Sequence, residues 1–518
     1  MKETARHLKQ NCKNCWVFHN NFFLLPEFKF FLMSIDGLSK YEAVIGLEVH
    51  VQLNTRSKLF AGDSAAFGSA PNTHVSAITL GHPGTLPRMN KEAIVHAIKM
   101  GLVCHSDIAR YNYFARKNYF YPDLPKGYQI SQHTTPICAG GMVRISTSAG
   151  SRDIKLTRIH LEEDAGKSMH DQSPEHTYLD YNRAGVPLIE IVSEPDMHTA
   201  EEAAAYLTKI RQLVRWIGIC DGNMEEGSLR CDANISVRPV GEKKLGTRVE
   251  VKNLNSIKHL RHAVELEIGR LSALSDKGER IIQETRSYDA EKEVTFSIRT
   301  KEDAEDYRYF PEPDLAPFRF SEEFIQQIKN QLPELPDAKQ SRYTKAYNLS
   351  EYDAIQLTED YELNELFEVL AAGTSHRKSL VNFLIGPVRA YLNSQNKPWS
   401  SLTISKSQWY GLLDLVAGGQ ISFSVAAQKI LPELLTNTDI DPVQLATSLN
   451  LLQDAGETEI EQWVNEVIMA MPDKVEAYRK GKKGLIGLFV GEVKRISKGK
   501  ADPKRSTELL NKVLNEKQ

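Results

Sequence analysis

The chain has 518 residues, of which 41% are hydrophobic and 25% are charged, and its 64 basic and 67 acidic residues give a formal net charge of −3. This composition is ordinary for a soluble protein with a large core and roughly two to four domains. It excludes a uniformly basic coat protein for nucleic acids, although a local basic patch can still bind RNA. The six cysteines are few for this length and indicate a reducing compartment, and Cys12 and Cys15 have no second pair to complete a four-cysteine zinc site.

The first segment differs in composition from the rest of the chain. Residues 16–33 are rich in aromatic residues and leucine, but Pro26, Glu27 and Lys29 interrupt them, so they do not predict a membrane span. Met33 lies just before the first convincing strand. We therefore expect translation to start at Met33 and residues 1–37 to be an extension outside the fold. An intact mass that includes Met1 or Lys2 would contradict this expectation.

Residues 44–53, VIGLEVHVQL, predict a strand with one apolar and one polar face. From Leu47 onward the apolar residues alternate with Glu48, His50 and Gln52, which is the period of a β-strand. A carboxylate and an imidazole then lie side by side, as in metal sites and acid–base sites. A half-exposed strand whose polar residues simply face water explains the same pattern.

Two later segments favour the metal site. Residues 159–164 place Glu162, Glu163 and Asp164 at the end of an alternating run, and residues 187–195 form an apolar strand that contains the single carboxylate Glu190. An isolated carboxylate in an apolar strand is costly to bury without a partner or a metal. Three strands that carry acids and a histidine therefore suggest one shared cation site.

Residues 111–132 combine many aromatic residues with Arg116, Lys117 and Lys126. Such a combination can stack on bases and hold phosphates, and an aromatic core layer with solvated charges is an equal alternative. Elsewhere in the chain, Asn90 predicts the start of a helix over residues 91–102, and Thr199 with Glu202 predicts a capping box.

Alternating strands interrupted by a few helices predict an α+β fold, with a mostly antiparallel sheet over residues 38–331. Residues 332–446 then predict an all-α domain, and residues 447–518 predict a small helical tail domain. Beyond Met471 lysine and arginine crowd the chain. This concentration of charge favours RNA binding over a solvated helical end.

Several long motifs, taken together and in order, resemble the B subunit family of the tRNA-dependent aspartyl/glutamyl-tRNA amidotransferases. They are VIGLEVHVQL (44–53), RKNYFYPDLPKGYQISQ (116–132), IHLEEDAGKS (159–168), DYNRAGVPLIEIVSEPD (180–196), MEEGSLRCDANISVRP (224–239), EVKNLNS (250–256), DYRYFPEPDL (306–315) and LIGLFVGEVKRISKGKADP (485–503).

The resemblance implies a cradle domain, a helical linker domain and a tail domain that grips tRNA. It implies a cytoplasmic heterotrimer with an amidase (A) subunit and a small (C) subunit, and no membrane or DNA partner. In this family the B subunit uses ATP and Mg²⁺ to phosphorylate the side-chain carboxylate of Glu or Asp misattached to tRNA. Ammonia from glutamine, released by the amidase, then gives Gln-tRNA or Asn-tRNA.

By this resemblance His50, Glu163 and Glu190 are the expected metal ligands, with Glu48 and Glu162 beside them as catalytic acids. A histidine ligand leaves Mn²⁺ or zinc open as well as Mg²⁺ at this site. Lys117 and Arg116 are the expected contacts to the phosphates of ATP.

Some family members bind structural zinc through cysteines in the loop that corresponds to residues 61–80. This loop has no cysteine here, so no structural zinc is expected in it. Two other functions are an RNA-binding or assembly protein with a decayed site and an independent metallohydrolase. The intact acids disfavour the former, and the basic tail disfavours the latter.

Overall fold

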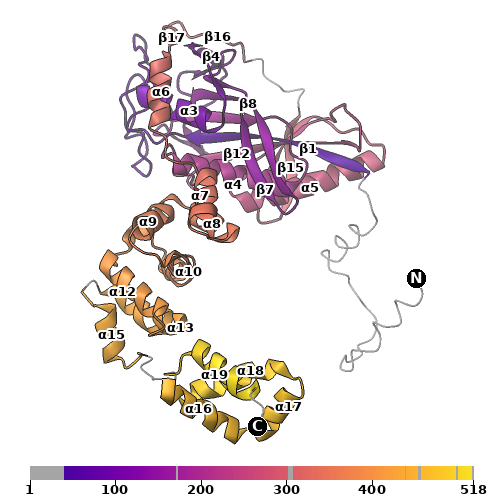
Figure 1. Ribbon diagram of the computed structural model, residues 1–518. Coiled ribbons are helices and arrows are strands. Elements are labelled where there is room, and N and C mark those ends of the chain that lie inside the picture. The colour runs from indigo at the N-terminus through magenta and orange to yellow at the C-terminus, as the bar shows by residue number, and fades with distance from the viewer. Residues whose placement is uncertain are drawn as a thin grey trace.

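The structure, a computed structural model, describes residues 40–170, 173–300, 307–437, 439–452, 457–497 and 500–515. The expected extension, residues 1–37, and its cysteines lie outside these residues. A sheet-rich region comes first and an almost entirely helical region follows it (Figure 1). This arrangement confirms the α+β fold class.

Strand β1 (Tyr41–Gln52) lies inside a 13-stranded sheet, between β11 (Pro187–Ser193) and β12 (Leu229–Pro239), and is antiparallel to both. The other strands are β2 (Asp107–Ile108), β3 (Tyr111–Asn112), β4 (Ala115–Asn118), β5 (Tyr128–Ser131), β6 (Cys138–Ala139), β7 (Met142–Thr147), β8 (Gly150–Glu163), β9 (Lys167–Met169), β10 (Tyr178–Asp180), β13 (Val249–Lys252), β14 (Glu284–Asp289), β15 (Val294–Thr300), β16 (Phe310–Pro311) and β17 (Phe318–Arg319). The main path of the sheet runs β15-β14-β13-β12-β1-β11-β8-β5-β4-β16. Among the described strands β13 and β14 form the one parallel pair.

The two faces of β1 differ as its sequence predicts. Leu47, Val49 and Val51 are fully or almost fully buried, and they share one hydrophobic core with the helices α3 (Lys91–Val103), α4 (Ala200–Trp216) and α5 (Ile257–Asp276). The polar residues of the same strand stay half-buried on the opposite face. The core therefore fixes the strand from one side and leaves the other side for polar side chains.

Both predicted helix starts are present. The Asn90 side chain accepts a hydrogen bond from the Glu92 backbone N–H at 2.9 Å, at the N-terminus of α3. Thr199 and Glu202 form the predicted capping box of α4. Because α4 packs under the sheet that carries β1, its cap stabilises the floor of the polar face.

Replacing Thr199 with alanine should lower the free energy of unfolding of the sheet-rich region by about 1 kcal/mol, since one donor at the N-terminus of α4 loses its side-chain partner. Urea unfolding followed by circular dichroism measures this change. Thr208→Ala, inside the same helix, is the matched control and should change the stability much less. Equal effects of the two substitutions would contradict the role of the cap.

The helical half forms an arc that leads away from the sheet to the C-terminal helices (Figure 1). Its principal helices are α6 (Glu322–Asn330), α7 (Pro336–Ala346), α8 (Glu351–Thr358), α9 (Tyr361–Ala371), α10 (Arg377–Phe383), α11 (Arg389–Ser394), α12 (Lys406–Ala417), α13 (Phe423–Val425), α14 (Leu431–Thr436), α15 (Pro442–Ser448), α16 (Glu457–Ala470), α17 (Pro472–Arg479), α18 (Ile486–Ile496) and α19 (Pro503–Asn515). None of the described helices is long and apolar enough to cross a membrane.

Three separate hydrophobic cores follow one another along the chain. The first includes residues from Ala43 to Ile328, the second from Tyr343 to Ala446 and the third from Ile460 to Leu514. Helix α6 still packs in the first core, through Ile325 and Ile328. The C-terminal helices α16 to α19 therefore have a core of their own.

Candidate functional site

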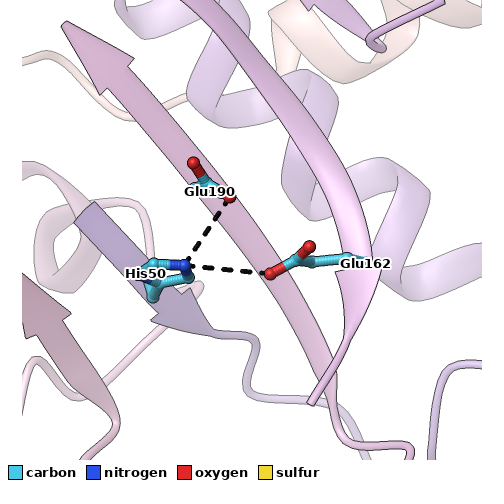
Figure 2. Close-up of side chains that lie close together, drawn as sticks. All are labelled: His50, Glu162 and Glu190. Atoms are coloured by element: carbon cyan, nitrogen blue, oxygen red, sulfur yellow. Dashed lines mark ion pairs between the residues drawn. The ribbon is translucent and has the colours of Figure 1, made fainter. Parts of the chain in front are cut away.

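Three neighbouring strands bring a histidine and two carboxylates together on the polar face of the sheet. His50 of β1 lies opposite Glu190 of β11, and Glu190 lies opposite His160 of β8, two residues before Glu162. The Nε2 atom of His50 is 3.6 Å from Oε2 of Glu190 and 3.9 Å from Oε1 of Glu162 (Figure 2). The strand register thus gathers side chains that are far apart in the sequence.

His160 completes this group. Its Nε2 atom lies 3.5 Å from Oε2 of Glu162 and 3.4 Å from Oε2 of Glu190, and the residue is buried. Two imidazoles and two carboxylates therefore form one compact polar cluster. His160 was not among the residues expected from the sequence, although it shares its strand face with Glu162 by simple alternation.

The charged groups in the cluster shift the pKa values of one another. Burial alone would lower the pKa of His50, but its contact with Glu190 and the charge of Glu162 raise it to about 9. Burial alone would raise the pKa of Glu190, but His50, His160 and Lys117 hold it well below its usual range. The protein environment therefore favours an ionised carboxylate that can bind a cation.

His50, Glu162 and Glu190 each offer one ligand atom, and the three atoms lie within 4.8 Å of one another. This nitrogen and oxygen donor set fits a divalent cation such as Mg²⁺ or Mn²⁺, and the histidine suits Mn²⁺ better than Mg²⁺. His160 lies against both carboxylates and can orient them, as residues behind a metal ligand commonly do.

The position of Glu163 corrects the expected ligand set. Its side chain pairs with Lys126, and its Oε1 atom accepts a hydrogen bond from the backbone N–H of Ile130 at 2.9 Å. Successive residues of a strand point to opposite faces, so Glu162 and Glu163 cannot both face His50. The side chain grouped with His50 and Glu190 is therefore that of Glu162 and not that of Glu163.

A second acidic group lies beside the first on the same face. Glu48, Asp232 and Glu250 have ligand atoms within 4.8 Å of one another, and Lys252 bridges two of them, at 2.6 Å from Asp232 and 2.9 Å from Glu250. Asn234 donates to Glu48 at 2.9 Å. Burial and the charge of Glu190 raise the pKa of Glu48. Glu48 thus lies next to the His50 cluster but faces other partners.

A hollow of about 230 Å³ opens at the Glu48 end of this polar face. It lies over β1, β11 and β12, and its lining includes Gly46, Val192, Asn234 and Arg248. Because β1 is continuous, the hollow, the Glu48 group and the His50 cluster follow one another along the strand. An elongated ligand can therefore contact all three.

The two expected phosphate contacts have different surroundings. The guanidinium of Arg116 pairs with buried Glu312 at 2.7 Å and with Asp314 at 3.1 Å, where β16 pairs with β4, and its role as a phosphate contact stays a prediction. The Lys117 ammonium lies 4.8 Å from the ring centre of Tyr307. Burial would lower the pKa of Lys117, but the charge of Glu162 contributes to raising it.

Another cationic group, not expected from the sequence, lies at the end of the polar face away from the hollow. Arg230 of β12 is the strand partner of His50, and its Nη2 atom donates to Asp164 at 2.7 Å. Gln52 donates to the same carboxylate oxygen at 2.7 Å, and Arg183 lies 3.7 Å from it. Burial alone would raise the pKa of Asp164, but Arg230 and Arg183 lower it.

Comparison with known proteins identifies the family of this chain. Residues 43–326 match the model of the GatB/GatE catalytic domain, and residues 365–514 match that of the GatB domain. The chain belongs to the GatB family.

Relatives that are named as the B subunit of an aspartyl/glutamyl-tRNA(Asn/Gln) amidotransferase align along almost their whole length. The chain is 46% identical to the one from Thermodesulfovibrio yellowstonii, over 92% of this chain and 100% of that protein. It is 47% identical to the protein of the same name from Nitratidesulfovibrio vulgaris, over 92% and 100%. It is 46% identical to the protein of that name from Chlorobium phaeobacteroides, over 92% of this chain and 99% of that protein. Both acidic groups and Arg230 lie within the matched catalytic domain of this GatB chain.

Proposed function

We propose that this chain is the subunit of a tRNA-dependent amidotransferase that activates the side-chain carboxylate of Glu-tRNA(Gln) or Asp-tRNA(Asn) with ATP. A carboxylate oxygen attacks the γ-phosphorus, the bond from that phosphorus to the bridging oxygen breaks, and ADP leaves with the electron pair. Ammonia then attacks the acyl carbon, phosphate leaves, and one proton is lost. The products are Gln-tRNA(Gln) or Asn-tRNA(Asn).

The observation that carries this proposal is the meeting of His50, Glu162 and Glu190 within 4.8 Å of one another on an open polar face. Phosphoryl transfer needs positioning and charge neutralisation more than covalent help from the protein. A divalent cation held by these residues supplies that neutralisation for the phosphates. We place the nucleoside end of ATP in the hollow beside Glu48, because this hollow lies on the same face.

The names of the relatives support a multisubunit assembly, since each relative is named as one subunit of an amidotransferase. We infer an amidase (A) subunit that releases ammonia from glutamine and a small (C) subunit as the partners. We infer a cytoplasmic location as well, because translation there uses the aminoacylated tRNA. No DNA or membrane partner enters this function.

Reconstitution with the two partner subunits tests the proposal. Misacylated Glu-tRNA and Asp-tRNA are offered separately with glutamine, Mg²⁺ and ATP, and the aminoacyl products are analysed after deacylation. We expect glutamine or asparagine on the tRNA and phosphate release that depends on the tRNA. Amide formation without ATP, or ATP hydrolysis that ignores the misacylated tRNA, would refute the activation step.

We propose that the tail helices α16 to α19 bind tRNA, because many basic residues lie in this segment, which has its own hydrophobic core. A hollow of about 310 Å³ is lined by three cations and two carboxylates, together with Gly418 and Gly419 at the end of α12; the charged residues are Lys500, Lys504, Arg505, Asp502 and Glu508. Cations around such a hollow can contact the phosphate backbone of a bound tRNA.

Replacing Lys500, Lys504 and Arg505 together with alanine should weaken tRNA binding and reduce the slope of log K against log salt by up to about 3, since each phosphate contact contributes about 1. Filter binding at several salt concentrations measures this slope. The double variant Lys277→Ala/Lys292→Ala removes exposed lysines of the sheet-rich region and serves as the control. Removal of residues 456–518 should weaken tRNA binding further. An unchanged slope in the triple variant would exclude this surface.

A further inference from the structure

Arg230 has no role in the proposed function so far, yet it extends across the polar face beside the His50 cluster. It starts on β12, opposite His50, and reaches Asp164, which follows β8 on the far side of β1 and β11. Gln52 of β1 donates to the same Asp164 oxygen, so the guanidinium lies beside the end of β1 that follows the His50 cluster. Its charge acts on Glu162 and Asp232 as well as on Asp164.

One hydrogen-bond donor of this guanidinium is unused. The Nε atom of Arg230 is buried and has no hydrogen-bond partner among the described residues, whereas Nη2 is held by Asp164. A buried donor without a partner costs free energy unless a ligand or water satisfies it. The Arg230 side chain as a whole is 34% exposed, so a ligand can approach it. The planar fork of arginine suits the oxygens of a phosphoryl group, which can accept from two of its nitrogens.

The order of groups along β1 assigns an end of the nucleotide to Arg230. The hollow lies beside Gly46 and Glu48, the cation cluster lies at His50, and Arg230 and Gln52 lie at or beyond it. With the nucleoside in the hollow and the phosphates over the acids, the terminal phosphoryl group comes nearest to Arg230. The carboxylate that receives this group must approach from the same end.

We propose that Arg230 contacts the phosphoryl group during its transfer to the side-chain carboxylate, and that Asp164 is the positioning residue that holds its guanidinium in place. The inference rests on the proposed function, because it assumes ATP as the phosphoryl donor. Arg230 neither takes nor gives a proton; it stabilises the negative charge shared by the attacking oxygen, the phosphoryl oxygens and the departing ADP.

The test uses the reconstituted complex and measures phosphate release from γ-labelled ATP that depends on misacylated tRNA. Arg230→Ala should lower kcat by about 100-fold, as removal of a transition-state donor commonly does. The affinity for tRNA should not change. The affinity for Mn²⁺ alone should not fall, because removing a positive charge near Glu162 does not weaken cation binding. Arg238→Ala is the matched control, since it removes an ion-paired arginine from the other end of β12.

A second variant separates this role from a purely structural one. Arg230→Ala removes a cation that pairs with the buried carboxylate of Asp164. The double variant Arg230→Ala/Asp164→Asn also removes the negative charge of that carboxylate. If Arg230 contacts the phosphoryl group, the double variant regains thermal stability but stays inactive, and added guanidinium ion restores part of the rate of Arg230→Ala. Recovery of the wild-type rate in the double variant, or a rate for Arg230→Ala within twofold of wild type, would overturn the inference. A wild-type complex without ATP-dependent activity would instead refute the proposed function itself.

Discussion

Replacing His50 with alanine should lower the rate of amide formation on misacylated tRNA by at least about 100-fold in the reconstituted complex. Mutation of a residue that only supports a metal ligand commonly lowers metal affinity or activity by roughly 10- to 100-fold. His50 offers a ligand atom itself, so its loss should cost at least as much. The variant also leaves Glu162 and Glu190 with one imidazole, that of His160, instead of two, so their mutual repulsion grows. Product analysis under single-turnover conditions measures the loss.

Binding of tRNA to the His50→Ala complex should stay close to that of wild type, because the basic tail has a separate core and lies far along the chain. Glu190→Ala should behave in the same way. His376→Ala, a partly exposed histidine of the helical region, is the control and should keep full activity. If the His50 and Glu190 variants lost tRNA binding as strongly as activity, the separation of catalysis from tRNA binding would be wrong.

Glu162→Gln should weaken Mn²⁺ binding by about 100-fold or more, whereas Glu163→Gln should leave it nearly unchanged. The two substitutions are chemically identical and adjacent, but only Glu162 shares the strand face of His50 and Glu190. Equilibrium dialysis, or electron paramagnetic resonance of free Mn²⁺, gives both affinities in the absence of ATP and tRNA.

Thermal unfolding supplies the control for this pair. Glu163 is almost fully buried against Lys126 and the backbone of Ile130, so Glu163→Gln should lower the melting temperature more than Glu162→Gln does. Glu162→Gln should therefore lose more Mn²⁺ affinity, and Glu163→Gln should lose more stability. A loss of Mn²⁺ binding in Glu163→Gln at a temperature where it is fully folded would restore the ligand set suggested by family resemblance.

Local patterns in the sequence predicted the elements that frame the site. The alternation after Leu47 identified the buried and polar faces of β1, and Thr199 with Glu202 identified the start of α4. Such patterns are enough to predict a strand face or a helix start, because they involve residues that are close together in the sequence. The same alternation in β8, with apolar Ile159 and Leu161, would have placed His160 and Glu162 on the polar face.

Sequence reasoning did not reveal partners that are distant in the sequence. Arg116 looked like a phosphate contact because its aromatic neighbours suggested stacking, but its carboxylate partner Glu312 comes almost two hundred positions later. Arg230 was overlooked because nothing near it in the sequence shows that it pairs with the strand of His50. Register between strands depends on the whole sheet, so a single sequence does not reveal it.

The position of β1 in the sheet also determines when this protein can complete its fold during synthesis. Its neighbours on either side, β11 and β12, emerge only after residues 187 and 229 have been translated, and Tyr41 finds its partner at Pro239. At ribosomal speeds of about 5 to 20 residues per second, β1 waits roughly 7 to 30 s for β11 at one edge and roughly 10 to 40 s for β12 at the other. An unpaired strand edge is prone to aggregation. We therefore expect the yield of folded protein to depend on chaperones and to fall when elongation slows between β1 and β12.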